Sequence, residues 1–315
     1  MTVELGPAQV RAAAARVAGL VRTVPVTPMG PVAGAQLLLV HEYLQHTGSF
    51  KARGAMNLTQ AHRQAGTLPA AGVTIASGGN AGLACAWAAA ACGVRATVFL
   101  PHTAPPVKLA RLRGYGAEVH LTGVEYADAA AACQDFAERS GALLSHAYDN
   151  PLIAAGAGTC AAELLDQRAI DTIMVAVGGG GLLGGTIAAT ELAGTRVVAV
   201  EPARCQALHA ALAAGRPVDV PVESVAADSL GARRVSELAC RLADQARVRS
   251  VLVDDEAIVA ARRQLWRDWR IVVEHGGATA LAAVLSGSYQ PATDERVAVV
   301  LCGANTDPSD LAAAG

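Results

Sequence analysis

A lysine stands at the start of a predicted helix, directly after the polar turn Thr47-Gly48-Ser49. The helix is expected to cover residues 50–63, and Ser49 has the side chain to cap it. Because the positive end of a helix disfavours a further positive charge, the ammonium of Lys51 tends to lose its proton there. A neutral amine condenses with aldehydes, so Lys51 is a candidate nucleophile. The same position also suits an ordinary surface lysine, and the other motifs decide between the two interpretations.

A run of glycines follows a predicted buried strand, where residues 178–185 read Gly-Gly-Gly-Gly-Leu-Leu-Gly-Gly. Glycines let backbone N–H groups approach an anion closely, and the helix that follows points its positive end at the same place. The run therefore predicts a phosphate-binding loop. It is not a Walker loop, because no Lys-Ser or Lys-Thr follows. Positions 179, 181 and 184 also fit G-x-G-x-x-G, and Glu201 ends the next strand, so a dinucleotide site stays open on local grounds.

Three further segments carry side chains that bind small polar groups. The turn from Ser77 to Gly82 places Ser77 and Asn80 before a helix, where they suit a carboxylate, although a plain capped turn has the same residues. Cys302 ends the last predicted strand, where a buried core thiol is the ordinary interpretation. Glu274 opens another helix and also fits a simple charge near a helix start.

Short aliphatic runs alternate with alanine-rich helical patterns along the chain, which predicts an α/β fold with largely parallel sheets. The expected strands cover residues 36–41, 72–76, 96–100, 118–121, 172–177, 196–200, 248–253 and 296–301. The expected helices cover residues 80–92, 106–115, 126–140, 151–167, 183–192, 206–214, 255–270 and 277–285. We expect residues 72–148 to form a small mobile domain, and residues 1–71 plus 149–315 to form a larger one.

The composition argues against several classes of partner. The chain has 315 residues, 52% of them hydrophobic and 17% charged, with a formal net charge of -2, so it offers no basic field for nucleic acid. Its longest apolar stretch, residues 83–94, is too short to span a bilayer, and no signal peptide is recognisable, which predicts a cytoplasmic protein. Seven cysteines and eight histidines show no disulfide framework and no metal-ligand spacing.

Taken together and in this order, the segments resemble the fold type II pyridoxal-phosphate enzymes, and within them the serine/threonine dehydratase and serine racemase group. The resemblance covers nearly the whole chain. It is carried by residues 45–55 around Lys51, 77–82, Leu100-Pro101, Ala104-Pro105, Lys108, 115–119, 178–182, Glu201-Pro202, Leu230-Gly231, Glu274 and Cys302-Gly303. It implies a tryptophan synthase β-like fold, with two parallel-type sheets flanked by helices, in a homodimer.

The resemblance also assigns roles to individual residues. Lys51 would hold pyridoxal 5'-phosphate as a Schiff base, with Phe50 packed on the ring and Asn80 bonded to its 3'-hydroxyl. The phosphate would lie on Gly178, Gly179, Gly180, Gly181 and Leu182. Gly231 and Glu274 would line the ring edge, and Cys302 would face the pyridine nitrogen. The substrate carboxylate would lie on the turn that contains Ser77, Gly78, Asn80 and Ala81. By the same resemblance, Glu201 would be the only carboxylate at the cation site of the family. One carboxylate is too few for a divalent ion, so at most a monovalent ion held mainly by carbonyl oxygens is expected.

The function that the resemblance implies is β-elimination: conversion of a small β-hydroxy amino acid such as L-threonine or L-serine to a 2-oxo acid and ammonia. A thiol at the pyridine nitrogen favours loss of a leaving group over transamination. Racemases of the group have serine where this chain has Gly78, which argues against racemisation. The alternatives are a racemase or β-replacement enzyme of the same fold, and a non-catalytic nucleotide- or ligand-binding protein on a Rossmann-like sheet.

Overall fold

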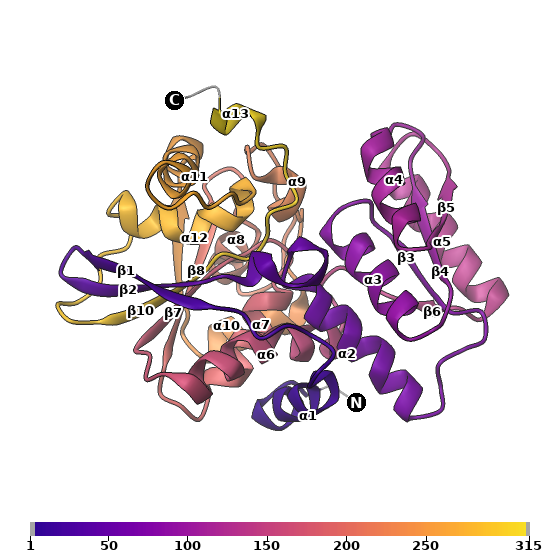
Figure 1. Ribbon diagram of the computed structural model, residues 1–315, viewed down its shortest axis with the longest axis horizontal. Helices are drawn as coiled ribbons and strands as arrows, with labels where there is room; N and C mark the ends of the chain where they lie inside the picture. The colour runs from indigo at the N-terminus through magenta and orange to yellow at the C-terminus, as the bar shows by residue number, and fades with distance from the viewer. Residues whose placement is uncertain (1–3, 313–315) are drawn as a thin grey trace.

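The computed structural model describes residues 4–312 and contains two sheets that are almost entirely parallel (Figure 1). The larger sheet has the strand order β1-β2-β10-β7-β8-β9, and the smaller has the order β5-β4-β3-β6. The one antiparallel pair is β1 with β2, a hairpin at the edge of the larger sheet. The predicted α/β fold with two parallel-type sheets is confirmed.

The strands are β1 (Val26–Val32), β2 (Ala35–Val40), β3 (Val73–Ala76), β4 (Ala96–Leu100), β5 (Glu118–Leu121), β6 (Leu143–Leu144), β7 (Thr172–Ala176), β8 (Arg196–Pro202), β9 (Arg249–Val253) and β10 (Arg296–Val300). The longer helices are α1 (Pro7–Val17), α2 (Lys51–Gln64), α3 (Asn80–Ala91), α4 (Pro106–Gly114), α5 (Tyr126–Ser140), α6 (Pro151–Gln167), α7 (Gly181–Thr190), α8 (Ala207–Ala214), α10 (Glu237–Gln245), α11 (Asp255–Trp269) and α12 (His275–Leu285). Short helical segments are η1 (Glu42–Leu44), η2 (His46–Gly48), α9 (Ala227–Leu230) and α13 (Ser309–Ala312).

Helices cover both faces of the larger sheet. In Figure 1, α11 and α12 lie on one side of its strands, and α6, α7 and α10 lie on the other. The central strands β7 and β10 are buried almost throughout, as expected for parallel strands covered on both faces. Since aromatic residues make up only 3% of the chain, the core between these layers consists mainly of alanine, valine and leucine.

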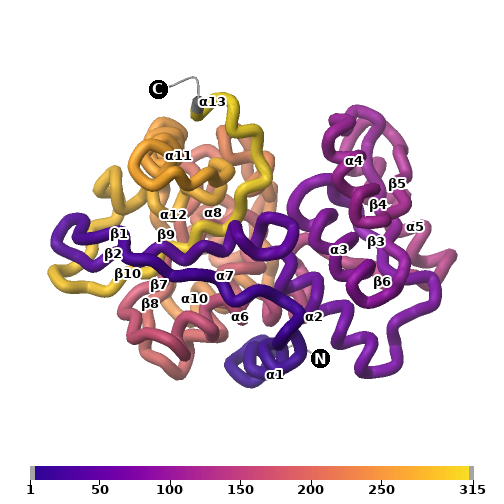
Figure 2. Tube along the Cα trace, viewed as in Figure 1, coloured from indigo at the N-terminus to yellow at the C-terminus, as the bar shows by residue number. Residues whose placement is uncertain are grey.

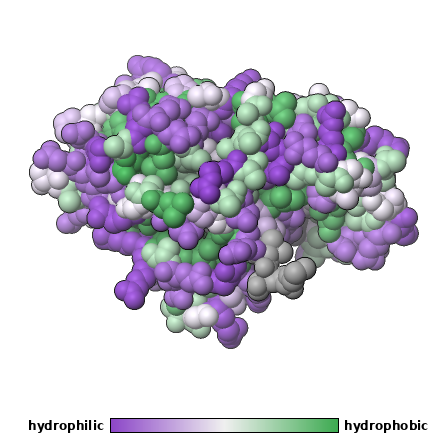
Figure 3. Space-filling model, turned by 90° about the horizontal axis from the view of Figure 1, so that it is seen from below, coloured by the Kyte–Doolittle hydropathy of each residue, from purple (hydrophilic) through white to green (hydrophobic). Residues whose placement is uncertain are grey.

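All four strands of the smaller sheet come from residues 73–144, and α3, α4 and α5 pack around them. Figure 2 shows this lobe beside the larger one, with α2 at the junction of the two. Viewed from below, the surface is mostly hydrophilic, and apolar residues appear in small groups between polar ones (Figure 3).

Most predicted elements match the observed ones within two residues, and β4, β5, α5 and α6 match in full. Helix α6 shows why the start of a helix can be predicted from the sequence. The Asn150 side chain accepts hydrogen bonds from the backbone of Leu152 and Ile153, and Pro151 occupies the first helical position. Helix α7 begins at Gly181, two residues before the prediction, because the glycine run itself enters the helix. Strands β1 and β6 and helix α10 were not predicted.

Candidate active site

A cavity of about 540 Å³ lies between the two lobes, and both contribute to its wall. Lys51, in the first turn of α2, reaches into this cavity, where its Nζ donates to the carbonyl oxygen of Ala147 at 3.0 Å. The same Nζ lies 4.5 Å from the centre of the Phe50 ring. The candidate nucleophile is therefore half-buried in a cavity and does not sit on the open surface.

Burial lowers the pKa of Lys51 from its ordinary value of 10.5 to about 8, while the nearby carboxylate of Glu274 opposes this shift. The lowered pKa makes the neutral amine more abundant at neutral pH than it is for an exposed lysine. His146 faces the same amine, and its own pKa is lowered mainly by burial. The pKa of Lys51 is thus lowered, in the direction expected from the sequence, but the cause is burial in the cavity and not the positive end of the helix.

The prediction that Ser49 caps α2 is wrong. Ser49 is extended, with φ of −161° and ψ of 158°, and forms an isolated antiparallel bridge with Gly303. Its hydroxyl is buried and has no hydrogen-bond partner among the described residues. Phe50 is the residue that precedes the helix, and its backbone N–H donates to the carbonyl of Cys302 at 3.0 Å. This pairing with the end of β10 holds the lysine segment in place.

The glycine loop lies between β7 and α7 and lines the cavity through Gly178, Gly179, Gly180, Gly181 and Leu182. Gly180 has φ of 94°, and a Cβ there would come within 2.4 Å of the Ala239 side chain. A Cβ on Gly178 would come within 3.0 Å of the Leu230 backbone. The first N–H groups of α7 have no acceptor within the helix. These two glycines are thus required by packing, whereas the fit to a phosphate rests on the free N–H groups at the start of α7, which lie in the cavity wall.

Hydrogen bonds among the side chains of Asn80, Glu274 and Asn305 join the two lobes. Asn80, the first residue of α3, donates from Nδ2 to Glu274 Oε1 at 2.8 Å and accepts from Asn305 Nδ2 at 2.5 Å. Burial raises the pKa of Glu274 to about 7, and the hydrogen bond from Asn80 opposes the shift. A Cβ on Gly303 would come within 2.4 Å of Glu274 Oε1, so Gly303 leaves the space that this carboxylate occupies.

Cys302 lies in the cavity wall at the end of β10, as the sequence predicts. Its thiol is buried and points at the carbonyl of Gly276, with Sγ 3.6 Å from the oxygen. Burial raises its pKa to about 12, and the neighbouring Glu274 adds to the shift. The group that faces the cavity here is thus a neutral thiol.

Ser77, in the turn before α3, and Asn80 and Ala81, at the start of α3, belong to the wall, but Gly78 does not. Gly78 lines a smaller neighbouring space, and a Cβ on it would come within 2.8 Å of Leu100 Cδ2. Gly231 does lie in the wall, at the end of α9. All the residues assigned to the cofactor, and all those assigned to the substrate except Gly78, are therefore brought together in one cavity.

Glu201 lies outside this cavity. It is fully buried, and its two carboxylate oxygens accept the backbone N–H groups of Leu208 and His209 at 2.7 and 2.8 Å, at the start of α8. A ribose hydroxyl cannot reach it, which argues against the dinucleotide interpretation. Within residues 4–312, no group of three or more His, Cys, Asp or Glu side chains could hold a metal ion. A monovalent cation held by carbonyl oxygens stays a prediction.

Several wall residues were missed by sequence reasoning. Tyr148, in the segment that leads from the smaller sheet to α6, packs its ring over the glycine loop, where a Cβ on Gly179 would come within 2.2 Å of it. Its hydroxyl donates to the carbonyl of Arg234 at 3.2 Å. Lys108 of α4 donates to Asp228 of α9 at 2.6 Å and closes one side of the cavity. Of these residues, the sequence indicated only Lys108, which belongs to one of the motifs that carry the family resemblance.

The comparisons with known proteins agree with this geometry. Residues 17–303 match the model of the family described as pyridoxal-phosphate dependent enzymes. The chain belongs to this family. It is 38% identical over 272 residues to the L-threonine ammonia-lyase of Geobacter sulfurreducens, covering 84% of this chain and 66% of that protein. It is 35% identical over 291 residues to a serine dehydratase-like protein of Rattus norvegicus, covering 88% of this chain and 87% of the other.

Among solved structures, the chain is similar to maize serine racemase, with a TM-score of 0.92 and 29% identity over 99% of this chain and 97% of that one. The cofactor of the family is pyridoxal phosphate, and the buried amine and the glycine loop in one cavity fit its aldehyde and its phosphate. Within residues 4–312, no helix has both the length and the apolar character needed to cross a membrane.

Proposed function

We propose that the protein is a pyridoxal-phosphate-dependent lyase that converts a β-hydroxy amino acid such as L-threonine or L-serine to a 2-oxo acid and ammonia. The observation that carries the proposal is that the Lys51 amine, with a pKa of about 8, lines the same cavity as a neutral thiol and the glycine loop. The relatives named as a threonine ammonia-lyase and as a serine dehydratase-like protein support the same activity.

Pyridoxal phosphate, when bound, withdraws electrons from the α-carbon of an attached amino acid. The chain's own residues would bind the cofactor and take the α-proton. Lys51 would be the covalent anchor, and its Nζ, once free and neutral, would take the α-proton. The glycine loop would hold the phosphate, Phe50 would pack on the ring, and Asn80 would donate to its hydroxyl. Gly231 and Glu274 would line the ring edge.

Cys302 is proposed to face the pyridine nitrogen. Because the thiol has a pKa of about 12, it stays neutral over the whole useful pH range and does not fix a proton on the ring nitrogen as a carboxylate would. A ring without that proton holds negative charge poorly, which favours rapid loss of the β-hydroxyl over slower side reactions. Ser77, Asn80 and Ala81 would hold the substrate carboxylate at the start of α3.

A racemase is the second candidate, because maize serine racemase has a closely similar fold. Gly78 has no side chain and its position faces Leu100 outside the cavity wall, so no acid at position 78 delivers a proton to the opposite face, which argues against a racemase. We expect the native chain to form almost no D-serine from L-serine. In Gly78→Ser, Leu100 has to move before the hydroxyl finds room, so any gain in racemisation is expected to be small.

A panel of L-serine, L-threonine, phenylserine and hydroxyaspartate tests the proposal, with 2-oxo acid and ammonia measured for each and chiral chromatography of the remaining amino acid. Equimolar 2-oxo acid and ammonia from at least one of them supports the lyase. Inversion of serine as fast as pyruvate formation would instead make the protein a racemase.

Three wider features are part of the same proposal. Residues 72–148 would move as a small domain over the cavity. The contacts of Asn80 with Glu274 and of Lys108 with Asp228 would hold the cavity closed. The protein would work as a homodimer, as the family resemblance implies, and sedimentation tests this. A cytoplasmic location is supported by the buried, unpaired state of six of the seven cysteines, since a reducing compartment keeps thiols free.

A further inference from the structure

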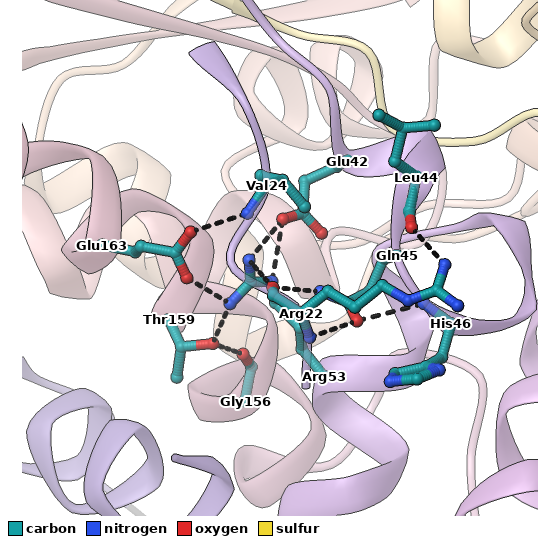
Figure 4. A network of polar contacts seen from close by, with 10 residues as sticks. All are labelled: Arg22, Val24, Glu42, Leu44, Gln45, His46, Arg53, Gly156, Thr159 and Glu163. Carbon is teal, nitrogen blue, oxygen red and sulfur yellow. Dashed lines mark hydrogen bonds and ion pairs between the residues drawn. The ribbon is translucent and has the colours of Figure 1, made fainter. Parts of the chain in front are cut away.

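Arg53 is two residues after Lys51, and residues two apart on a helix point in nearly opposite directions. While Lys51 faces the cavity, Arg53 is almost fully buried on the other side of α2. Figure 4 shows its guanidinium between Glu42 on one side and Glu163 on the other. A fully buried arginine needs partners for its charge and for its five N–H donors.

Every one of those donors has an acceptor. Nε and Nη2 of Arg53 both donate to Glu42 Oε1, at 2.8 and 2.6 Å. Nη1 donates to Thr159 Oγ1 at 3.3 Å and to Glu163 Oε2 at 3.1 Å, and Nη2 also donates to the carbonyl of Arg22 at 3.3 Å. Thr159 and Glu163 belong to α6, so this one side chain fixes the start of α2 against α6 and two loops.

The pair of Glu42 and Arg53 closes the loop of residues 42–53, which carries Lys51 near its end. Inside the loop, Thr47 has φ of 62°, a left-handed conformation that a residue with a Cβ keeps only where its surroundings hold it. The loop is also tied to the segment that follows β10, because the Phe50 N–H donates to the Cys302 carbonyl at 3.0 Å and the Ala304 N–H donates to the Gly48 carbonyl at 2.9 Å. The loop is thus held at its ends by one buried ion pair and at its centre by backbone bonds.

The same network continues along the loop. Gln45 Oε1 accepts the backbone N–H of Arg22 at 2.9 Å, and Gln45 Nε2 donates to the Arg22 carbonyl at 2.8 Å. Glu163 Oε1 accepts the N–H of Val24 at 3.1 Å. Figure 4 shows these contacts converging on the residues that surround Arg53. None of these side chains lines the cavity.

We propose that the Glu42–Arg53 ion pair is a positioning clamp for Lys51, which closes the loop of residues 42–53 and holds the first turn of α2 so that Nζ stays inside the cavity. The clamp touches neither substrate nor cofactor and acts only through the position of the lysine. This inference rests on the proposed function in so far as Lys51 is the reactive amine.

The chain offers a clean way to follow that amine, because Lys51 and Lys108 are its only lysines. In the apoprotein, trace acetylation over a range of pH, read by peptide mass spectrometry, gives the midpoint of each lysine separately. For Lys51 of the native chain we expect a midpoint near 8. The groups that face this amine are Glu274, Cys302 and His146, and all are left unchanged.

The decisive variant combines Glu42→Leu with Arg53→Met. Replacing a buried ion pair by apolar residues of similar volume is often neutral for stability, whereas removing one partner alone leaves a buried charge. We expect the double variant to fold, and the Lys51 midpoint to rise from about 8 toward 10.5 as the loosened amine reaches water. The midpoint of Lys108 should not change. Cofactor incorporation should slow by up to about 100-fold, the effect of a misplacement of about 1 Å.

Two further variants separate position from charge and from stability. Glu42→Gln keeps the shape but removes a negative charge; charge loss alone would lower the Lys51 midpoint, while a loosened clamp raises it. Arg296→Met breaks the ion pair with Asp171 at the amino-terminal ends of β10 and β7, and serves as the control for loss of an ion pair. It should leave the Lys51 midpoint and the rate of cofactor incorporation as they are.

A double variant with the native melting temperature, the native Lys51 midpoint and the native rate of cofactor incorporation would overturn the proposal. The proposal would also be overturned if the Lys51 midpoint and the rate of cofactor incorporation changed no more in the double variant than in Arg296→Met. Because acetylation is measured without cofactor or substrate, these results are independent of whether the panel of β-hydroxy amino acids reveals a lyase. In the loaded enzyme, the clamp variants should lower kcat and leave KM nearly unchanged, since the residues proposed to hold the substrate carboxylate belong to the other lobe.

Discussion

Two alanine substitutions in the same glycine run should have opposite effects on stability. Gly180 has φ of 94°, and a Cβ there would come within 2.4 Å of Ala239 Cβ and 2.9 Å of Val235 Cγ2. Gly184 lies inside α7, and a Cβ there would make only ordinary contacts, of 3.7 Å or more. The first position therefore needs glycine for its backbone and its space, and the second needs it for neither.

The magnitudes follow from these contacts. A left-handed conformation costs an alanine about 1–2 kcal/mol. Overpacking a well-packed site costs a further ~1–3 kcal/mol. Gly180→Ala should thus lower the free energy of unfolding by about 2–5 kcal/mol. Gly184→Ala should raise it by about 0.5–1 kcal/mol, because alanine in a helix loses less backbone entropy on folding than glycine.

Urea denaturation of the apoprotein measures both free energies of unfolding, and a titration with pyridoxal phosphate followed by visible absorbance gives the affinity of the loop. Gly180→Ala should also weaken cofactor binding, since the loop must shift to admit the methyl group. The reasoning fails if Gly180→Ala has native stability and native affinity, or if Gly184→Ala is destabilised as much as Gly180→Ala.

Three other predictions concern the cavity. Lys51→Ala should abolish turnover and leave no adduct that borohydride can reduce onto the protein; a reducible adduct that persists would point to another amine. Glu274→Gln should move the Lys51 midpoint below 8 in the apoprotein, because the carboxylate opposes the effect of burial, and an unchanged or higher midpoint would contradict this. Lys108→Met should raise KM several-fold while changing the free energy of unfolding by less than about 1 kcal/mol, since its ion pair with Asp228 is partly exposed; a native KM would show that this pair does not close the cavity.

The sequence predicted the parts of the site that are local along the chain. Lys51, the glycine loop and Asn80 each follow a turn with a recognisable pattern, and each pattern places its residues at the carboxyl end of a strand or the start of a helix. The same holds for Cys302 at the end of β10. Local patterns suffice here because parallel strands bring all such ends to the same edge of their sheet.

What the sequence did not predict depends on contacts between distant segments. Tyr148 reaches the glycine loop only because the segment before α6 crosses the cavity. Ser49 has a good capping side chain, yet its backbone pairs with Gly303, more than 250 residues away, and the extended conformation takes it out of the cap position. Gly78 fits the motif but is turned toward Leu100, a direction that only the fold of the smaller sheet decides.

The scarcity of lysine connects the composition with the chemistry of the site. Of the 25 basic residues two are lysines, so 25 − 2 = 23 are arginines. An arginine keeps its proton and does not condense with an aldehyde, whereas a lysine does so once it is neutral. Both lysines lie in the cavity wall, but Lys108 forms an ion pair with Asp228, and Lys51 donates to the neutral carbonyl of Ala147. Burial and the choice of partner together therefore leave Lys51 as the one side-chain amine in the cavity that is poised to react.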